Sequence, residues 1–215
     1  MNPRRALLLV GLVLCGGTAA HAERGALSAD IGWGVGLINV RPPYVQGSPS
    51  QIGSSFVTSL GFRYALTNAL EVGAAGFYQP PTTFTHGDAQ VPAPGGLLPG
   101  TLSERTQQFG FLLRGRFVQG FTWRFVAGAD IGFATRTFSN IDHYNVSDPA
   151  MGPRSYGLNL ADTSQKNLLL APSAGVEWAG DHFTIGLAPR VEFLVGSVRT
   201  WALSLPLSIS WSWYL

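Results

Sequence analysis

The side chains best suited to chemistry in this 215-residue chain are ionisable groups that recur at alternate positions of glycine- and aromatic-rich segments. Six are arginines and five are carboxylates: Asp30, Arg63, Glu71, Arg114, Arg116, Arg124, Asp130, Arg136, Glu177, Arg190 and Glu192. Opposite charges in such numbers can pair, or they can line a polar channel or gate whose pairs rearrange. Buried pairs satisfy each other's charge more than they add stability. We favour a paired, closed interior, with Glu104 as a further carboxylate near the outer mouth.

A catalytic site needs a nucleophile, a base and an orienting group within hydrogen-bond reach. His86 and His143 fall in long connections, and His182 borders a tight turn. Serine and histidine side chains facing lipid at the outer leaflet would mark a lipid-modifying enzyme, and the sequence shows no such cluster. We therefore predict no catalytic residue and no cofactor.

Two short motifs place histidine near aspartate, His86-Gly87-Asp88 and Asp142-His143. A structural metal site needs about four ligands at suitable spacing, and each motif supplies two. We interpret both as solvated loop residues and predict no metal site. The glycine-rich run from Gly32 to Gly36 lies within a strand pattern, so it is not a phosphate-binding loop between a strand and a helix.

The elements that must position these groups are eight segments in which apolar side chains alternate with polar or small ones. This is the period of a β-strand whose two faces meet different surroundings. The segments are Leu27 to Val40, Ser55 to Leu66, Leu70 to Gln79, about Thr106 to Val118, Thr122 to Phe138, Asn167 to Trp178, Phe183 to Val195, and Trp201 to Leu215.

In all eight segments the apolar parity carries no ionisable group, whereas the other parity carries all eleven. A soluble sheet would show the reverse, with charge facing water and the apolar face buried. The pattern predicts an all-β protein: an eight-stranded antiparallel up-and-down transmembrane β-barrel with short periplasmic turns and longer extracellular loops. An eight-stranded barrel is just wide enough for side chains to fill its interior.

The connections alternate between long and tight, as this architecture requires. Residues 41–54, 80–105 and 139–166 are predicted as long outer loops, and turns near Asn68, Gly120 and Gly180 as tight. The connection at 196–200 is short although it falls on the outer side. Loops 80–105 and 139–166 are the predicted contact surfaces for an extracellular partner, or they merely cover the barrel mouth.

The first 22 residues have the pattern of a cleavable secretory signal: Arg4 and Arg5, a short apolar run, and small residues at Ala20 and Ala22. Residues 23–215 then form the barrel domain. An alternative is a lipoprotein acylated at Cys15, but Leu14 stands where that site normally has a small residue. Without the signal the chain has no cysteine for disulfides or thiolate chemistry.

The overall charge and the hydropathy exclude two other classes of protein, nucleic-acid-binding proteins and helical membrane proteins. Removing Arg4 and Arg5 leaves 12 basic and 12 acidic residues, so no positive field remains to attract nucleic acid. Beyond the signal, no apolar stretch approaches the length of about 18 residues that marks a transmembrane helix. Helical membrane proteins are therefore excluded.

The signal, the alternating strands, the turn from Tyr64 to Glu71 and the aromatic-rich end resemble small outer-membrane barrels of the OmpA, OmpX and OmpW type. The resemblance covers Gly25 to Leu215 and is architectural. It implies an outer-membrane location, contact with outer-membrane lipids, and recognition of the C-terminal strand by the barrel assembly machinery. That family usually ends in phenylalanine or tryptophan, whereas this chain ends in Leu215.

The function that we expect is non-catalytic: a structural or surface-interaction role through the extracellular loops, with a charge-paired closed lumen. The first alternative is a narrow porin-like or OmpW-like channel for small or hydrophobic solutes. The second alternative is an outer-leaflet lipid-modifying enzyme.

Overall fold

The computed structural model describes residues 24–41, 50–93, 96–139, 143–148, 152–157, 162–196 and 199–214, which contain eleven β-strands. The strands are β1 (Ala26–Val40), β2 (Gln51–Ala65), β3 (Leu70–Ala93), β4 (Gly96–Gly120), β5 (Trp123–Ser139), β6 (His143–Asp148), β7 (Gly152–Gly157), β8 (Thr163–Ala179), β9 (Phe183–Leu187), β10 (Arg190–Val195) and β11 (Thr200–Tyr214). No helix in this part of the chain is long and apolar enough to cross a membrane. The predicted all-β class is confirmed.

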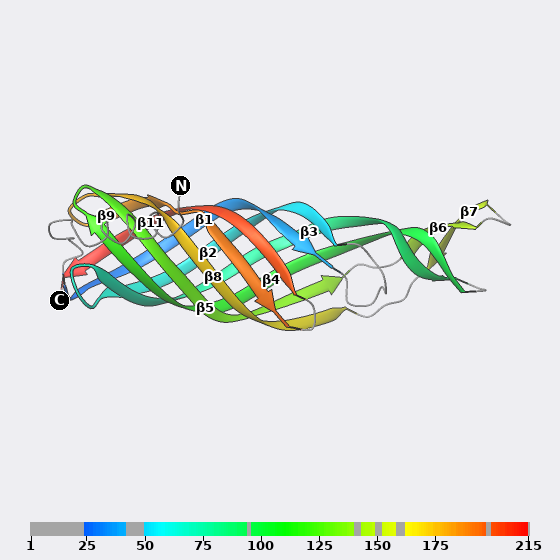
Figure 1. Cartoon of the computed structure of the whole chain (residues 1–215), viewed down its shortest axis with the longest axis horizontal. Coiled ribbons are helices and arrows are strands. Elements are labelled where there is room, and N and C mark those ends of the chain that lie inside the picture. The colour runs from blue at the N-terminus through cyan, green and yellow to red at the C-terminus, as the bar shows by residue number, and fades with distance from the viewer. Residues whose placement is uncertain are drawn as a thin grey trace, which may run out of the picture.

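The strands close into a ring (Figure 1). Neighbours pair antiparallel from β1 through β5 to β8, and β11 returns to β1 over a register from Ala26↔Tyr214 to Ile38↔Ala202. Between β8 and β11 lie β9 and β10, which both pair with these two neighbours. Among the described residues the ring thus has eight positions, with β9 and β10 sharing the seventh, and the predicted eight-stranded barrel is confirmed.

The interruption of the seventh position is a difference from the single predicted strand Phe183 to Val195. It falls at Ala188 and Pro189, which lie between β9 and β10. Proline has no N–H to donate to a ladder and is normally confined to sheet edges. Pro172 on β8 and Pro206 on β11 flank the break on the two adjacent strands. Three backbone N–H donors, at Pro172, Pro189 and Pro206, are therefore missing from neighbouring strands in this part of the wall.

The three tight turns lie at one end of the ring, where they join β2 to β3, β4 to β5 and β8 to β9. In the first, Thr67 Oγ1 accepts hydrogen bonds from the backbone N–H groups of Ala69 and Leu70 at 3.2 and 3.0 Å. The second depends on Gly120, whose φ of +118° favours glycine and whose added Cβ would collide with the backbone of Trp123.

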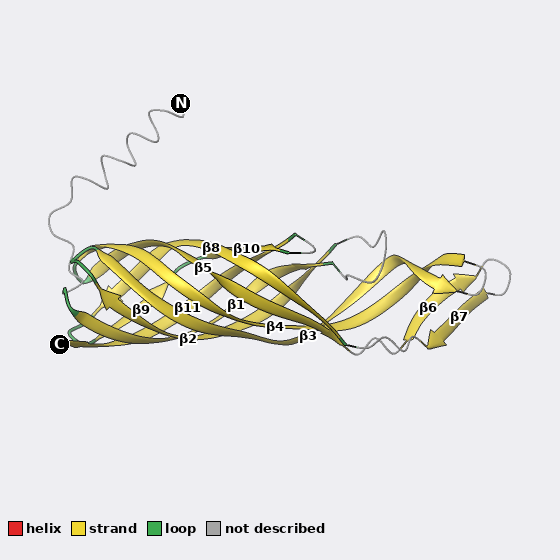
Figure 2. Ribbon diagram, turned by 90° about the horizontal axis from the view of Figure 1, so that it is seen from below, coloured by secondary structure: helices red, strands yellow, loops and turns green. Residues whose placement is uncertain are grey.

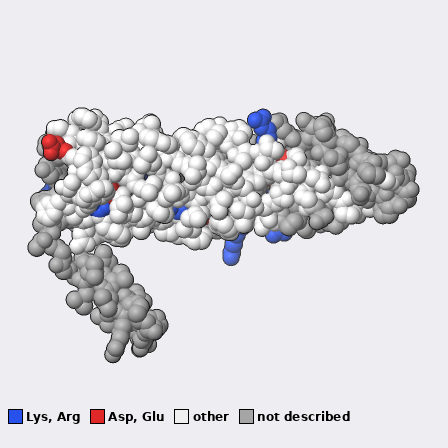
Figure 3. Space-filling model, turned by 90° about the horizontal axis from the view of Figure 1, so that it is seen from above, with Lys and Arg blue, Asp and Glu red and all other residues white. Residues whose placement is uncertain are grey.

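The outer wall of the ring is apolar. Val35, Leu60 and Phe133 are 64%, 61% and 72% exposed, and the neighbouring outward positions are also large hydrophobic side chains. Figure 3 shows a largely white wall, on which the most prominent charged side chains stand near its two ends. From Trp201 to Trp213, β11 spans roughly 40 Å along the strand, or about 30 Å along the axis at a tilt of about 40°. That length matches the apolar belt of a membrane barrel.

The prediction of residues 80–105 as a loop is wrong. β3 and β4 remain paired from Thr82↔Thr106 to Ala93↔Gly96 and form a twisted hairpin that extends well beyond the ring (Figure 2). The register shifts between Gln79 and Thr82, at Pro80 and Pro81, because a bulge there leaves residues unpaired and bends the strand.

The predicted loop 139–166 also contains strands. β6 and β7 form a second hairpin, and β6 pairs with β4 over Gly100↔Val146 to Leu102↔Tyr144. We call the extended β3–β4 hairpin together with β6 and β7 the projection. The third predicted loop, 41–54, is shorter than expected because β2 already begins at Gln51. The predicted signal, Cys15, Asp142 and Leu215 lie outside the described residues.

Candidate functional site

Nine of the eleven predicted lumen charges form one continuous chain of ion pairs with alternating sign. Its order is Glu177, Arg116, Glu71, Arg63, Asp30, Arg114, Asp130, Arg190, Glu192. We call it the lumen chain. The carboxylates in it are all less than 9% exposed, and the arginines lie between buried and partly buried.

The half of the lumen chain nearer the tight turns is the more tightly bonded. Arg116 Nε donates to Glu71 Oε2 at 2.6 Å, and its Nη2 donates to Glu177 Oε2 at 2.8 Å. Arg63 Nη1 donates to the same Glu71 oxygen at 3.0 Å, and Arg63 Nε donates to Asp30 Oδ1 at 3.2 Å. Two arginines thus share one carboxylate, as is common where several charges are removed from water together.

The other half of the lumen chain is looser. Arg114 donates to Asp30 at 2.9 Å and to Asp130 at 3.1 Å, which links opposite sides of the lumen. Arg190 lies 3.4 Å from Asp130 and 3.3 Å from Glu192, and its guanidinium sits 5.8 Å from the ring centre of Phe77. The last arginine of the lumen chain therefore lies beside an aromatic side chain.

The lumen chain draws on seven of the eight ring positions, because its members come from β1, β2, β3, β4, β5, β8 and β10. β11 joins through Ser210, whose hydroxyl accepts a hydrogen bond from Arg63. The charges consequently connect the whole circumference of the barrel.

The two remaining predicted charges bind differently. Arg124 donates to the backbone carbonyl of Phe121 at 3.1 Å, next to a tight turn. Arg136 is 2% exposed and lies within 4 Å of no carboxylate among the described side chains. Its Nε donates to Gln108 Oε1 at 2.9 Å, and its Nη1 reaches Thr200 Oγ1 across the lumen at 3.2 Å. Its hydrogen bonds therefore go to neutral groups.

A layer of apolar side chains crosses the lumen beyond Arg190, and sequence reasoning missed it. Its members are each no more than 5% exposed: Phe77, Leu112, Ala134, Leu169, Ala171 and Leu194, with Val57 packed against them. They come from six of the eight ring positions. The available signal was a run of three large apolar residues, as in Leu168-Leu169-Leu170, which breaks strict alternation.

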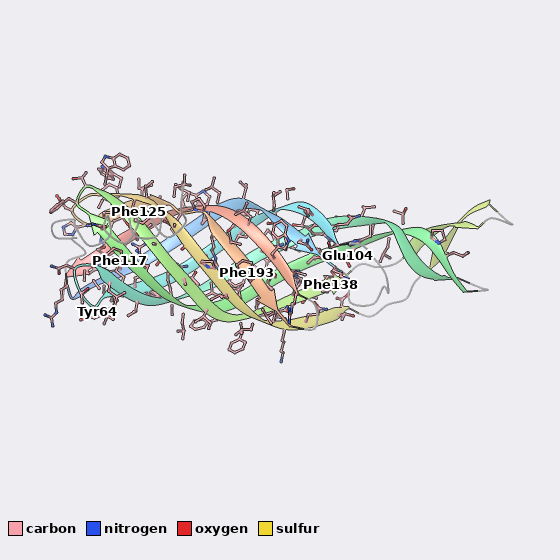
Figure 4. All side chains as sticks on the ribbon, viewed as in Figure 1. Tyr64, Glu104, Phe117, Phe125, Phe138 and Phe193 are labelled. Carbon is pink, nitrogen blue, oxygen red and sulfur yellow. The ribbon has the colours of Figure 1, made fainter. Side chains whose placement is uncertain are left out.

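A second apolar cluster lies nearer the projection: Ile38, Val40, Phe84, Phe138 and Ala202. On β5, Arg136 stands between Ala134 of the first layer and Phe138 of the second. Figure 4 shows Phe138 and Glu104 at the end of the ring where β3 and β4 continue into the projection. Polar and apolar layers thus alternate along the lumen.

The interpretation of His86 as a solvated loop residue is wrong. Its side chain is 0% exposed, and Nε2 lies 2.9 Å from Oε1 of Glu104, which is itself buried. Glu104 therefore pairs with histidine at the base of the projection. The side chains of Asp88 and His143 lie outside the described residues, and no cluster of three metal-ligating side chains occurs in the described part.

A cavity of about 90 Å³ lies beside the middle of the lumen chain. Asp30, Arg114, Asp130 and Arg190 line it together with the hydroxyls of Ser59 and Ser204. A water molecule occupies about 30 Å³ in the liquid, so this space suits a few hydrogen-bonded waters. Val57, which packs against the Phe77 layer, also lines this cavity.

Comparison with known proteins finds similarity at the level of solved structures. No family model matches the chain, and no curated protein matches it. The structure is similar to Ail, the attachment invasion locus protein of Yersinia pestis, at 13% identity over 88% of this chain and 99% of that one, with a TM-score of 0.47. Neisserial surface protein A gives 13% identity, 88% and 97% coverage and a TM-score of 0.48. The outer membrane protein OprG from Pseudomonas aeruginosa is 14% identical over 92% of this chain and 100% of that one, with a TM-score of 0.43.

The apolar outer wall and the charged interior of the closed ring decide the class of protein, since only a barrel surrounded by lipid places its charges inside. This chain is an outer-membrane β-barrel. The predicted location is thereby confirmed. In such barrels the tight turns face the periplasm and the long connections face outward, so the projection lies on the outer side of the membrane.

Proposed function

We propose that this protein is a non-catalytic outer-membrane barrel with a closed lumen, which acts at the cell surface by presenting its projection to an extracellular partner. The observation that carries the proposal is the projection itself. From Thr82 to Ala93, β3 continues for roughly 36 Å of strand beyond the bulge at Pro80 and Pro81. Ordering these residues into strands costs conformational entropy. A loop that only covered the barrel mouth would not need such an ordered extension.

The closed lumen supports a surface role over transport. Side chains of the lumen chain cross the barrel in several directions, and the Phe77 layer then fills the cross-section with apolar groups. An ion passing that layer would lose its hydration without gaining a partner, which is strongly unfavourable. A narrow channel would require Leu112, Leu169 and Leu194 to move apart together.

Planar-bilayer recording tests closure. Purified, refolded protein is expected to give no reproducible conductance steps, while the unboiled sample runs with a shifted mobility on a detergent gel and so shows that it is folded. Steps that disappear when Arg114 is replaced by alanine would instead establish the channel alternative.

A shortened chain tests the projection. Residues 84–104 are replaced by a two-residue Asn-Gly turn, which joins the paired residues Thr83 and Arg105 in the geometry that hairpins favour. Cells carrying the full chain and cells carrying the shortened chain are compared for attachment to a panel of immobilised glycans and matrix proteins. Attachment that needs residues 84–104 supports the proposal. Equal attachment of both strains to every surface contradicts it.

We also propose that β11 is the segment recognised by the barrel assembly machinery. It pairs with β1 over its full length and closes the ring. Exchange of Trp213 for serine is expected to lower the amount of barrel in the membrane fraction, and an unchanged amount would argue against recognition through this strand.

A further inference from the structure

We propose that one side of the barrel binds the phosphate groups of outer-leaflet lipid headgroups. The surface is the outward face of β3, β4, β5 and β8 directly above the apolar belt, and we call it the headgroup face. The headgroup face includes the base of the projection, where Arg105, Thr85 and Ser103 lie, and it does not depend on the extracellular partner proposed for the projection.

The belt ends at a definite level on these four strands. Its last large apolar side chains are Tyr78 on β3, Phe109 on β4, Phe133 on β5 and Leu168 on β8, and all four are more than 40% exposed. Immediately beyond them the described outward positions become threonine, serine, glutamine, proline, arginine and lysine. In a membrane barrel this change marks the depth of the headgroups.

Two exposed cations stand on the headgroup face, Arg105 on β4 and Lys166 on β8. Neither lies within 4 Å of a carboxylate among the described side chains. The outward positions of the four strands carry no acid in their described part, and the nearest exposed carboxylate along the chain is Asp162, just before β8. The charge of both cations is therefore available to an anionic ligand.

Hydroxyl groups occupy the surface around the two cations. Thr85 and Ser103 form a cross-strand hydrogen bond of 3.2 Å between β3 and β4, and Thr137 and Ser164 form one of 3.1 Å between β5 and β8. These groups can donate to phosphate or sugar oxygens at the same time as the cations do. The surface is four strands wide.

The strand register places the two cations too far apart to bind the same phosphate group. Arg105 pairs with Ser139 and Lys166 pairs with Thr135, so they stand four residues apart along β5 and two strands apart across it. Standard strand spacings convert this offset to about 17 Å between the two Cα atoms. Each cation therefore holds a separate phosphate; the Thr137–Ser164 pair lies between them, and the Thr85–Ser103 pair lies beyond Arg105 on the side of the projection.

The opposite wall has a different character. On β1, β2 and β10 large apolar side chains reach Leu37, Ile52 and Val195, which are 45%, 58% and 48% exposed, although Ser54 and Thr58 also face outward on β2. Two exposed cations, Arg41 and Arg199, follow only beyond the strand ends. Among the described residues, the exposed pairs of hydroxyls that bond to each other lie on the side of β3, β4, β5 and β8, so bound headgroups should gather on that side.

Lipid retention by the full-length barrel tests the proposal. The probe is bisphosphorylated lipid A supplied in phosphatidylcholine vesicles, and the readout is the number of lipid A molecules retained per barrel in native mass spectrometry. The double variant Arg105→Gln/Lys166→Gln is expected to weaken retention about fivefold for each cation removed, from the usual contribution of a basic residue at an anionic membrane surface. The matched control is Arg41→Gln/Arg199→Gln, which removes the same charge from the opposite wall and should retain lipid A as the natural chain does.

Additional measurements identify the ligand. Dephosphorylated lipid A should be retained no better by the natural chain than by the double variant, and Asp162→Asn should strengthen retention. Heat-modified gel mobility checks that each variant is folded. Equal losses in the double variant and its control overturn the proposed location. Complete displacement of lipid A by millimolar inorganic phosphate would show a site for free phosphate and overturn the lipid assignment.

Discussion

Replacing Arg190 with methionine isolates the last member of the lumen chain. Glu192 is 3% exposed, and Arg190 is the one described cation within 4 Å of it. Asp130, the other partner of Arg190, keeps Arg114 at 3.1 Å. The substitution therefore leaves one buried carboxylate without an ion pair. Breaking a buried pair in this way costs about 3–5 kcal/mol.

Two companion variants separate the unpaired charge from lost packing. Glu192→Gln leaves Arg190 paired with Asp130 and removes a 3.3 Å ion-pair contact whose two atoms form no hydrogen bond among the described residues, so it should cost less than Arg190→Met. The double variant Arg190→Met/Glu192→Gln removes both ends, and it should be more stable than Arg190→Met alone. The contact of Arg190 with Phe77 is lost in both Arg190 variants, so it cancels in the comparison.

Urea unfolding of the barrel in lipid vesicles, followed by the fluorescence of its 6 tryptophans, gives the free energy of unfolding for each variant. The order of stability should be natural chain, Glu192→Gln, double variant, Arg190→Met, with the middle two close together. Strictly additive losses would refute the reasoning, because they would mean that Glu192 does not depend on Arg190 for its charge.

Three other substitutions test the wall, the apolar layer and a turn with the same unfolding assay. Leu205→Arg places a charge on the lipid face and should cost about 2–4 kcal/mol if the residue lies near the midplane; a negligible cost would show that this face is not in lipid. Leu112→Ala with Leu169→Ala should cost about 2–5 kcal/mol for each side chain and introduce conductance steps in a planar bilayer, and a stable, silent double variant would mean that other groups close the lumen. Gly120→Ala should be destabilising because of its positive φ, whereas Gly115→Ala, with open space around its Cβ, should not; equal effects would contradict the turn geometry.

The faces of the strands were predictable because a side-chain period of two fixes them without knowledge of the fold. Charge on one parity placed Asp30 and Arg63 in the lumen before any contact was known, and both are buried. Which residue each lumen side chain contacts was harder to predict from the sequence. Arg136 reaches Thr200 from the far side of the ring, and such a contact depends on shear and strand tilt, which local sequence does not encode.

The errors have two local causes. The segment from Pro80 to Arg105 is rich in proline and glycine, which usually indicates a loop, yet its pairing is maintained by a hairpin that tolerates proline at bulges and exposed edges. The lumen leucines were missed because Leu112 and Leu169 lie in apolar runs that fit either face. A run of three apolar residues within an otherwise alternating strand is the sign of an apolar layer in the interior.

The lumen chain also has a consequence for how the ring is assembled. A slip of one strand by two residues would keep every apolar side chain facing lipid, so the membrane alone could not distinguish it from the correct arrangement. The same slip would move an arginine or carboxylate by almost 7 Å along the axis of its strand and separate it from both neighbours in the chain. Because the ion pairs join seven ring positions and Ser210 ties in the eighth, only one combination of registers satisfies all of them. The charged interior thus acts as a check on correct closure, which the uniform outer surface cannot provide.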